Sequence, residues 1–223
     1  MQTDPQQLKE LYEHRFDAQD RQDKAGVWKV LCAHFFSRYI QPSDTVLDVG
    51  AGYCEFINHV QATRRIAVDA NPEIHIFAGE GVEHHSCRAD ELSFLADGEV
   101  DVAFSSNFFE HLSDKTALVL LVKELHRVLK PGGRLLVMGP NVKYLPGVYW
   151  DWYDHHIPRT EKSVEELLQL GGFEIEASHP RFLPPTVKSR LPKWPWLVRA
   201  YLLLGPLSFP LFGKQFLVVG RKR

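Results

Sequence analysis

Short runs of consecutive apolar residues alternate along this chain with segments whose apolar positions recur at helical spacing. Runs at 45–49, 65–68, 100–105 and 134–138 are typical of buried strands. Between the last two, the apolar residues of 115–129 follow a helical period, with Ser113 or Asp114 as the expected N-cap. Strands that alternate with helices predict an α/β domain whose mainly parallel sheet is covered on both faces.

The remaining elements complete one domain over residues 1–223. An N-terminal helical cap is expected at 1–40, with Gly26 interrupting it, and a further helix at 56–63. Ser163-Val-Glu-Glu166 has the capping-box pattern and predicts a helix at about 163–170. The last two strands are predicted at 173–177 and 215–220, separated by a hydrophobic and basic insertion at 182–213.

Composition and charge narrow the class of protein. Hydrophobic residues make up 44% and charged residues 24%, as in ordinary soluble domains. A net charge of −2 gives no electrostatic reason to expect nucleic acid as a partner. The 3 cysteines lack CxxC spacing, which argues against a disulfide scaffold or a zinc site. With a polar N-terminus and no run of about 18 apolar residues, a cytoplasmic location is expected, with the inner face of a membrane as an alternative.

The sharpest feature is the glycine-rich turn after the first strand, Asp48-Val-Gly50-Ala-Gly52. Such a turn lets the backbone approach a ligand closely. A dinucleotide fold also uses it, but here Glu55 replaces the third glycine of that fingerprint. The carboxylate of Asp48 would repel a pyrophosphate and attract a cation. The pattern therefore favours the cationic cofactor S-adenosylmethionine.

Polar residues follow the other predicted strands, where ligands bind in such sheets. Asp69 closes the second strand and is expected to accept hydrogen bonds from both ribose hydroxyls. Asp90, with its neighbour Glu91, is assigned to the adenine side. Asn107 and Phe108 follow the fourth strand and are expected near the transferred methyl group.

Five ordered motifs resemble those of the class I S-adenosylmethionine-dependent methyltransferases, especially the small-molecule type. They are VLDVGAG, AVDAN, RADELSF, VDVAFSSNFFEHL and ELHRVLKPGGRLLV. The resemblance implies a Rossmann-like, doubly wound sheet of seven strands with an antiparallel last strand. It also implies cofactor contacts at Gly50, Gly52, Asp69, Asp90 and Asn107.

The segment Tyr12-Glu-His-Arg15-Phe16 is similar to N-terminal helices that cover the cofactor in some relatives. Tyr12 and Arg15 are accordingly assigned to the cofactor carboxylate, and a surface helix is the alternative.

The methyl acceptor is expected at the loop 149–156, which packs four aromatic residues, two acids and two histidines into eight positions. His155, then His156, is the candidate base, because a neutral imidazole accepts a proton at pH 7. In the resembling family a histidine at this place is also frequently structural. The assigned acceptor contacts are Asn141, Tyr149, Trp150, Tyr153 and Asp154.

The histidines allow two other interpretations. A metal site from Asp151, Asp154, His155 and His156 is disfavoured because adjacent side chains rarely converge on one ion, so no metal is expected. His111 is expected to be a packed histidine rather than a base.

The insertion combines Trp194 and Trp196 with the apolar run 197–204 and nearby basic residues, Lys188, Arg190, Lys193 and Arg199. Tryptophan and basic residues beside a short apolar helix suit peripheral membrane contact through 184–212. A lid over the acceptor pocket and a homodimer contact are the alternatives.

The sequence therefore predicts a methyltransferase that methylates an oxygen of a small molecule or glycan, lipid-linked if 184–212 meets a membrane. One alternative is a non-catalytic module that binds the cofactor and docks a partner through 182–213. An NAD-dependent oxidoreductase is less favoured, because it explains neither Asp48 nor Glu55. A nucleic-acid or protein acceptor is disfavoured because Asn107-Phe-Phe-Glu110 stands where an Asn-Pro-Pro-Tyr type motif would be.

Overall fold

A computed structural model describes residues 18–185 and 194–223 of the chain. The predictions made for Tyr12 and Arg15, and for Lys188, Arg190 and Lys193, lie outside the described residues.

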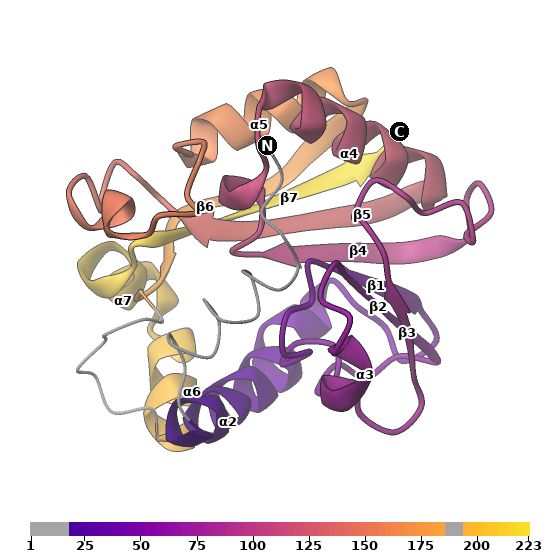
Figure 1. The fold of residues 1–223 in the computed structure, drawn as a ribbon. Coiled ribbons are helices and arrows are strands. Elements are labelled where there is room, and N and C mark those ends of the chain that lie inside the picture. Colours follow the sequence, from indigo (N-terminus) through magenta and orange to yellow (C-terminus); the bar gives the residue numbers. More distant parts are fainter. Residues whose placement is uncertain (1–17, 186–193) are drawn as a thin grey trace.

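A seven-stranded sheet forms the middle of the structure (Figure 1). Its strand order is β3-β2-β1-β4-β5-β7-β6. Neighbours from β3 to β5 pair in parallel, whereas β7 runs antiparallel to both β5 and β6. The seven-stranded, mainly parallel sheet and its antiparallel last strand are thus confirmed. The strands are β1 (Thr45–Val49), β2 (Arg64–Asp69), β3 (Val82–Ser86), β4 (Val100–Ser106), β5 (Leu129–Pro140), β6 (Phe173–Leu183) and β7 (Gln215–Lys222).

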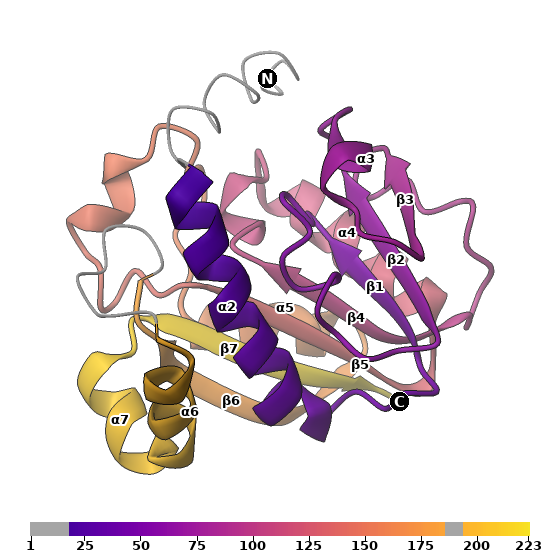
Figure 2. The same cartoon turned by 90° about the horizontal axis from the view of Figure 1, so that it is seen from below.

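Helices cover both faces of this sheet (Figures 1 and 2). One face carries α4 (Lys115–Val128) and α5 (Glu161–Leu170), and the other carries α2 (Ala18–His34), against which α6 (Pro195–Leu203) packs. A short α3 (Ile74–Phe77) lies beside β2 and β3, and α7 (Gly205–Phe212) leads into β7. Three single-turn helices are η1 (Phe36–Arg38), η2 (Phe109–His111) and η3 (Val148–Asp151).

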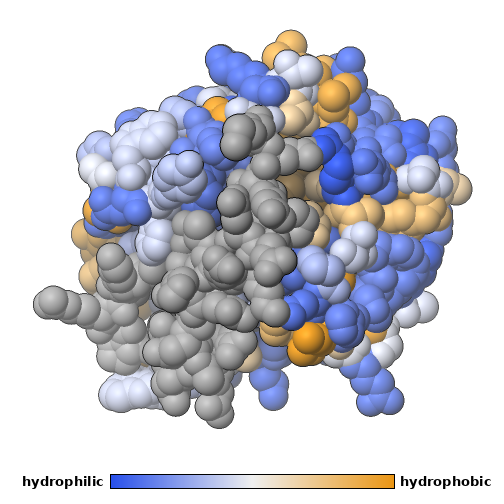
Figure 3. All heavy atoms as spheres, viewed as in Figure 1, coloured by the Kyte–Doolittle hydropathy of each residue, from blue (hydrophilic) through white to orange (hydrophobic). Residues whose placement is uncertain are grey.

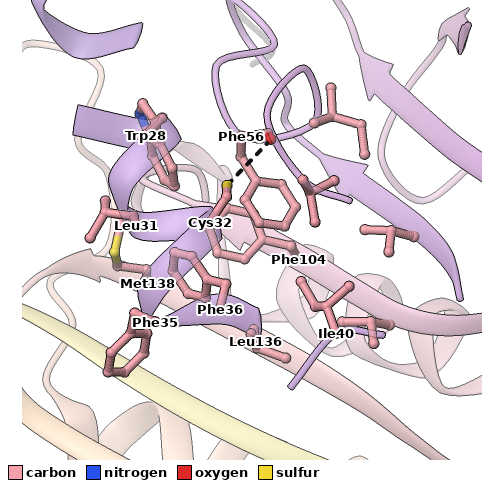
Figure 4. Close-up of a cluster of buried hydrophobic side chains, with 14 of the residues drawn as sticks. Trp28, Leu31, Cys32, Phe35, Phe36, Ile40, Phe56, Phe104, Leu136 and Met138 are labelled. Carbon is pink, nitrogen blue, oxygen red and sulfur yellow. Dashed lines mark hydrogen bonds between the residues drawn. The ribbon is translucent and has the colours of Figure 1, made fainter. Parts of the chain in front are cut away.

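The core is aromatic on the α2 face of the sheet (Figure 4). Phe56 stacks on Phe104 with ring centroids 3.8 Å apart, and Trp28 and Phe36 meet Phe104 edge to face. The buried Cys32 thiol lies 3.7 Å from the Phe56 carbonyl, which it faces as a weak hydrogen-bond donor. Burying each such ring contributes about 1.5–3 kcal/mol to stability, so α2 is held firmly against β4 and the turns after β1.

Three local predictions were wrong. Gly26 does not interrupt α2, because one glycine costs only about 1 kcal/mol in a helix and the buried face of α2 offsets that. Residues 56–63 form turns instead of a helix, following Cys54, whose φ of 58° is left-handed. The N-cap of α5 is Thr160, so Ser163 is the third helical residue of the capping box instead of its start.

The predicted N-cap of α4 is confirmed, whereas the predicted start of β5 at Arg134 is wrong. Asp114 caps α4 by accepting a hydrogen bond from the Ala117 amide at 2.9 Å. β5 begins at Leu129, so Pro131-Gly-Gly133 lies within the strand region instead of before it.

The insertion contains α6 and α7, which lie together beyond one end of β6 and β7 (Figure 2). The Tyr201 hydroxyl donates to the Phe182 carbonyl at 2.7 Å, and the Ser208 hydroxyl donates to the Tyr201 carbonyl at 2.6 Å.

Among the described residues no single helix is long and apolar enough to cross a membrane. Only α6 and α7 taken together are, and that pair is bent by 108°. On the face shown in Figure 3, the coloured residues are mostly hydrophilic and the hydrophobic ones form small separate areas.

Candidate active site

A cavity of about 210 Å³ lies at the carboxyl ends of the parallel strands. In Figure 1 the ends of β4 and β5 point toward the loop that carries η3. One part of the wall is the glycine turn after β1, with Asp48, Gly50 and Gly52. The lining also includes Glu110 and His111 after β4, and Tyr149 and His155 from the loop after β5.

The glycine turn is shaped by two left-handed residues, Gly50 at φ 71° and Gly52 at φ 52°. A Cβ atom at Gly50 would lie 2.4 Å from Cγ of Phe108, so the absence of a side chain lets that ring pack on the turn. A Cβ atom at Gly52 would meet no protein atom within 4 Å. The space beside Gly52 is therefore available to a ligand.

Three carboxylates surround this turn: Asp48 is buried, whereas Glu55 and Asp69 are partly buried. Asp48 is 3% exposed, and burial together with the nearby Glu55 and Asp69 raises its pKa well above the ordinary range. Burial also raises the pKa of Glu55, although Lys24, with Nζ 3.9 Å from Glu55 Oε1, opposes this. Carboxylates clustered in a largely desolvated wall are stabilised by a cation, so the donor set fits the positively charged sulfonium and ammonium groups of S-adenosylmethionine.

Asp69 stands at the end of β2 beside the turn. Its Oδ2 accepts a hydrogen bond from the Gly52 amide and its Oδ1 one from the Asn71 amide, each at 2.8 Å. Burial nevertheless raises the pKa of Asp69. The carboxylate thus fixes the second glycine of the turn, and its assignment to the ribose stays a prediction.

Asn107 follows β4 in a left-handed conformation, φ 50°, which asparagine tolerates better than most residues. Its amide donates to the Met138 carbonyl at 2.9 Å and its Nδ2 to Ser106 Oγ at 3.0 Å. Asn107 therefore lines the cavity in a fixed orientation.

The acceptor side is a network around two histidines. His111 Nδ1 lies 3.1 Å from Asp154 Oδ2 and 3.0 Å from the Asp154 carbonyl. Burial disfavours the charged ring, but the hydrogen bond and charge of Asp154, with Glu110, outweigh it and raise the pKa of His111. His155 Nδ1 lies 2.8 Å from the Tyr149 carbonyl, and the two histidine rings meet at 5.0 Å.

Tyr149 and Glu110 are buried residues that line the same cavity beside these histidines. Tyr149 is buried and its hydroxyl donates to the Ile157 carbonyl at 2.5 Å, and burial raises its pKa. Burial also raises the pKa of Glu110, against the opposing influence of His111. Ligand atoms of Glu110, His111 and His155 lie within 4.8 Å of one another. This is a different donor set from the one that the sequence suggested.

Several predicted acceptor contacts do not face the cavity. Trp150 is 54% exposed, Tyr153 is 89% exposed, and His156 is exposed as well, because the short η3 and the turn after it direct these side chains outward. Asn141 is buried, and its Nδ2 donates to Glu161 Oε2 at 2.7 Å and to the Pro180 carbonyl at 3.0 Å, so it joins β5 to α5 and β6. Asp154 contacts His111 instead of the cavity.

Asp90 and Glu91 also lie outside this cavity. Both Asp90 oxygens accept from Arg88, at 3.0 and 2.9 Å, and this partner lowers the pKa of Asp90. Glu91 lies 3.4 Å from Arg88 Nε. Their contact with adenine stays a prediction.

Sequence reasoning missed several lining residues. Lys24 and Trp28 come from α2 and Gln215 from the start of β7, and nothing in their local pattern marks them. Glu110 and His111 carried a usable signal, since they lie in the short η2 soon after the end of β4, but from the sequence alone His111 is expected to be a packed histidine.

The comparisons with known proteins agree with this geometry. Residues 47–137 match the family model described as a methyltransferase domain. A probable S-adenosylmethionine-dependent methyltransferase of Mycolicibacterium smegmatis is 37% identical over 84 residues, covering 37% of this chain and 32% of that protein. A ubiquinone/menaquinone biosynthesis C-methyltransferase of Agrobacterium fabrum is 27% identical over 167 residues, covering 67% and 64%.

A solved structure has the same fold. It is that of an S-adenosylmethionine-dependent methyltransferase from Thermotoga maritima, described as a possible histamine N-methyltransferase. The TM-score is 0.66 at 18% identity, covering 96% of this chain and 99% of the other. This chain spans less than half the length of several curated relatives that it matches.

Proposed function

We propose that this chain is a class I, S-adenosylmethionine-dependent methyltransferase that methylates an oxygen atom of a small molecule or a glycan. The proposal starts from the match of residues 47–137 to the methyltransferase-domain model. S-adenosylmethionine is its cofactor. The observation that carries the proposal is the juxtaposition in one cavity of a carboxylate-lined glycine turn and a histidine network.

Two groups of lining residues have different roles in the proposed reaction. When bound, the cofactor supplies a methyl group attached to a positively charged sulfur. Asp48 and the backbone at Gly50 and Gly52 hold that charge and leave room for the ligand, while Asn107 lines the same cavity. Holding the reactants in line removes most of the entropic cost of a two-molecule reaction.

His155 is the proposed acceptor of the hydroxyl proton. Donation of its Nδ1 proton to the Tyr149 carbonyl leaves Nε2 as the nitrogen that carries a lone pair. His156 is withdrawn as the second candidate, since its side chain is exposed and does not line the cavity.

Calorimetry tests the cofactor first. S-adenosylmethionine and S-adenosylhomocysteine are expected to bind, with NADH as the control that should not. Absence of binding at millimolar concentrations would contradict the proposal. Transfer of a radiolabelled methyl group to extract fractions, separated into lipid, glycan and small-molecule pools, then identifies the acceptor class.

The non-catalytic alternative predicts a different result. A module that only binds the cofactor would bind S-adenosylmethionine in the calorimetry and would transfer no labelled methyl group to any pool. A quinone precursor belongs among the defined acceptors, because the relative from Agrobacterium fabrum is named for C-methylation in quinone biosynthesis. A methyl group found on carbon would contradict the proposed oxygen acceptor.

We further propose that the insertion contacts a lipid surface at the inner face of a membrane. Large exposed apolar residues lie on α6, on α7 and at the residue before α6. We define the α6–α7 surface by six of them: Trp194, Trp196, Leu203, Leu207, Leu211 and Phe212. Arg199 on α6 is exposed beside them. Tryptophan with a basic residue beside an apolar patch suits a headgroup interface.

The lid alternative has less support. None of the described residues of α6 or α7 lines the cavity, and of the insertion's described part only Pro185 does. A lipid surface and a second copy of the chain remain the two occupants to distinguish.

Vesicle sedimentation distinguishes them. A variant with Trp196→Ser, Leu207→Ser and Leu211→Ser is expected to lose binding to vesicles that contain anionic lipid. Leu170→Ser is the matched control, because Leu170 is 84% exposed on α5, away from this surface. The alternative outcome is a wild-type protein that does not bind vesicles and elutes as a dimer, together with a triple variant that elutes as a monomer. That result would show that the surface serves self-association.

A further inference from the structure

We propose that Glu110, His111 and His155 form a site for a divalent transition-metal ion on the acceptor side of the cavity. The inference rests on the proposed methyl transfer to oxygen, and it makes His155 a ligand of the ion in place of the base proposed above. Glu110 and His111 lie in η2, whereas His155 comes from the loop after η3. Their ligand atoms lie within 4.8 Å of one another, and all three side chains line the same cavity.

The surroundings of both histidines are those of metal ligands. A ligating imidazole usually donates its other ring proton to a carbonyl or carboxylate, which fixes the ring and its tautomer. His111 Nδ1 has such partners in the carboxylate and carbonyl of Asp154, and His155 Nδ1 has one in the Tyr149 carbonyl. In each ring, Nε2 is then the nitrogen that offers a lone pair.

The charges around the site favour a cation. Glu110 and Asp154 are buried carboxylates, and Arg159 is the buried cation whose charge also acts on Glu110. Two carboxylates against one guanidinium leave an excess of negative charge when the histidines are neutral. A divalent ion offsets that excess where burial would otherwise penalise it.

The donor types specify the class of ion. Two imidazoles and one carboxylate suit Zn²⁺, Mn²⁺ or Fe²⁺ better than Mg²⁺, which prefers oxygen ligands. Three protein ligands at the wall of a cavity leave coordination positions for a further oxygen. The site therefore has the composition of a catalytic metal site rather than of a closed structural one.

The ion would act on the acceptor hydroxyl. Coordination lowers the pKa of that hydroxyl, and its proton passes to solvent. The oxygen lone pair forms the new bond to the methyl carbon, while the carbon–sulfur bond breaks and its electron pair stays on sulfur. His155 then contributes through the ion instead of accepting the proton itself.

Direct metal binding tests the inference without an acceptor. Untagged, metal-stripped protein is titrated with Zn²⁺, Mn²⁺ and Co²⁺ by calorimetry, and bound Co²⁺ is followed by its visible absorption. One ion per chain is expected. His111→Gln and His155→Gln should each weaken binding by at least tenfold, the loss typical of a removed ligand or its support. His156→Gln is the matched control, since that exposed neighbour lies outside the cavity.

Binding of S-adenosylhomocysteine, measured on every variant, separates the possible failures. A protein that binds this product but none of the three ions overturns the metal site and leaves the proposed function standing. Equal loss in His156→Gln would assign the ion to surface histidines and also overturn it. If the ligand variants do not fold, X-ray absorption of the Zn²⁺-loaded wild type decides, because fewer than two imidazole ligands would contradict the inference.

Discussion

The ring of Phe108 occupies the space into which any side chain at position 50 would project. A Cβ atom at Gly50 would lie 2.4 Å from Phe108 Cγ, and the backbone there has φ 71°. The first glycine of the turn is thus required by the protein's own packing, while the second, Gly52, borders open space. The two glycines of one motif serve different purposes.

Gly50→Ala is therefore expected to destabilise the fold as well as the site. The left-handed backbone and the collision with Phe108 together should cost about 2–4 kcal/mol, measured by urea unfolding. Gly26→Ala is the contrasting variant, since a Cβ atom there meets nothing within 4 Å in α2. It should stabilise by about 0.5–1 kcal/mol. Equal stability of the Gly50→Ala protein and the wild type would contradict the steric explanation.

Asp48→Asn should separate binding from stability. The folded-state pKa of Asp48 is raised by burial and by Glu55 and Asp69. Its contribution to stability is thus fully present below the unfolded pKa and is lost as pH rises through the folded pKa. Without cofactor, the free energy of unfolding of Asp48→Asn should therefore rise relative to that of the wild type as pH rises from the unfolded pKa to the folded pKa.

The same substitution removes one negative charge from the cofactor site. Affinity for S-adenosylmethionine should fall by at least about tenfold, or about 1.4 kcal/mol. Urea unfolding at several pH values and calorimetry check both effects. A stability difference that does not change with pH, or an unchanged affinity, would show that Asp48 is not the buried anion inferred here.

His155→Ala and His156→Ala form a matched pair of neighbouring substitutions. His155 lines the cavity and His156 is exposed. Once an acceptor is known, the first should reduce kcat by about 10²-fold or more, and the second should leave it nearly unchanged. Calorimetry with S-adenosylhomocysteine controls for the donor site, which both variants should retain. A larger loss in His156→Ala would reverse the assignment.

Thr160→Ala tests the start of α5. Thr160 Oγ1 accepts from the Ser163 amide at 3.2 Å, and Ser163 Oγ accepts from the Thr160 amide at 3.0 Å. Loss of this cap should reduce stability by about 1 kcal/mol, measured by chemical denaturation. Ser93→Ala, at an exposed position, should change it by less than about 0.5 kcal/mol. Similar losses in both variants would exclude a specific cap.

Sequence patterns located most of the sheet and the donor side of the site. Period and composition are local properties, so β1, β4 and the N-cap at Asp114 followed directly from neighbouring residues. Asp48 near the end of β1 and the glycines after it form one continuous motif, which is why their place at the cavity was predictable. Exact starts were less certain, as at α5, because Thr160 and Ser163 both have the chemistry of a cap.

The acceptor side was decided by tertiary structure. Lys24 and Gln215 reach the cavity from α2 and β7, and Glu110 and His111 meet His155 across a long stretch of chain. No local pattern encodes such meetings, because they depend on how strands and helices pack. Within 149–156 the sequence marked a chemically rich loop, yet only the folded backbone determined that His155 faces inward and His156 faces solvent.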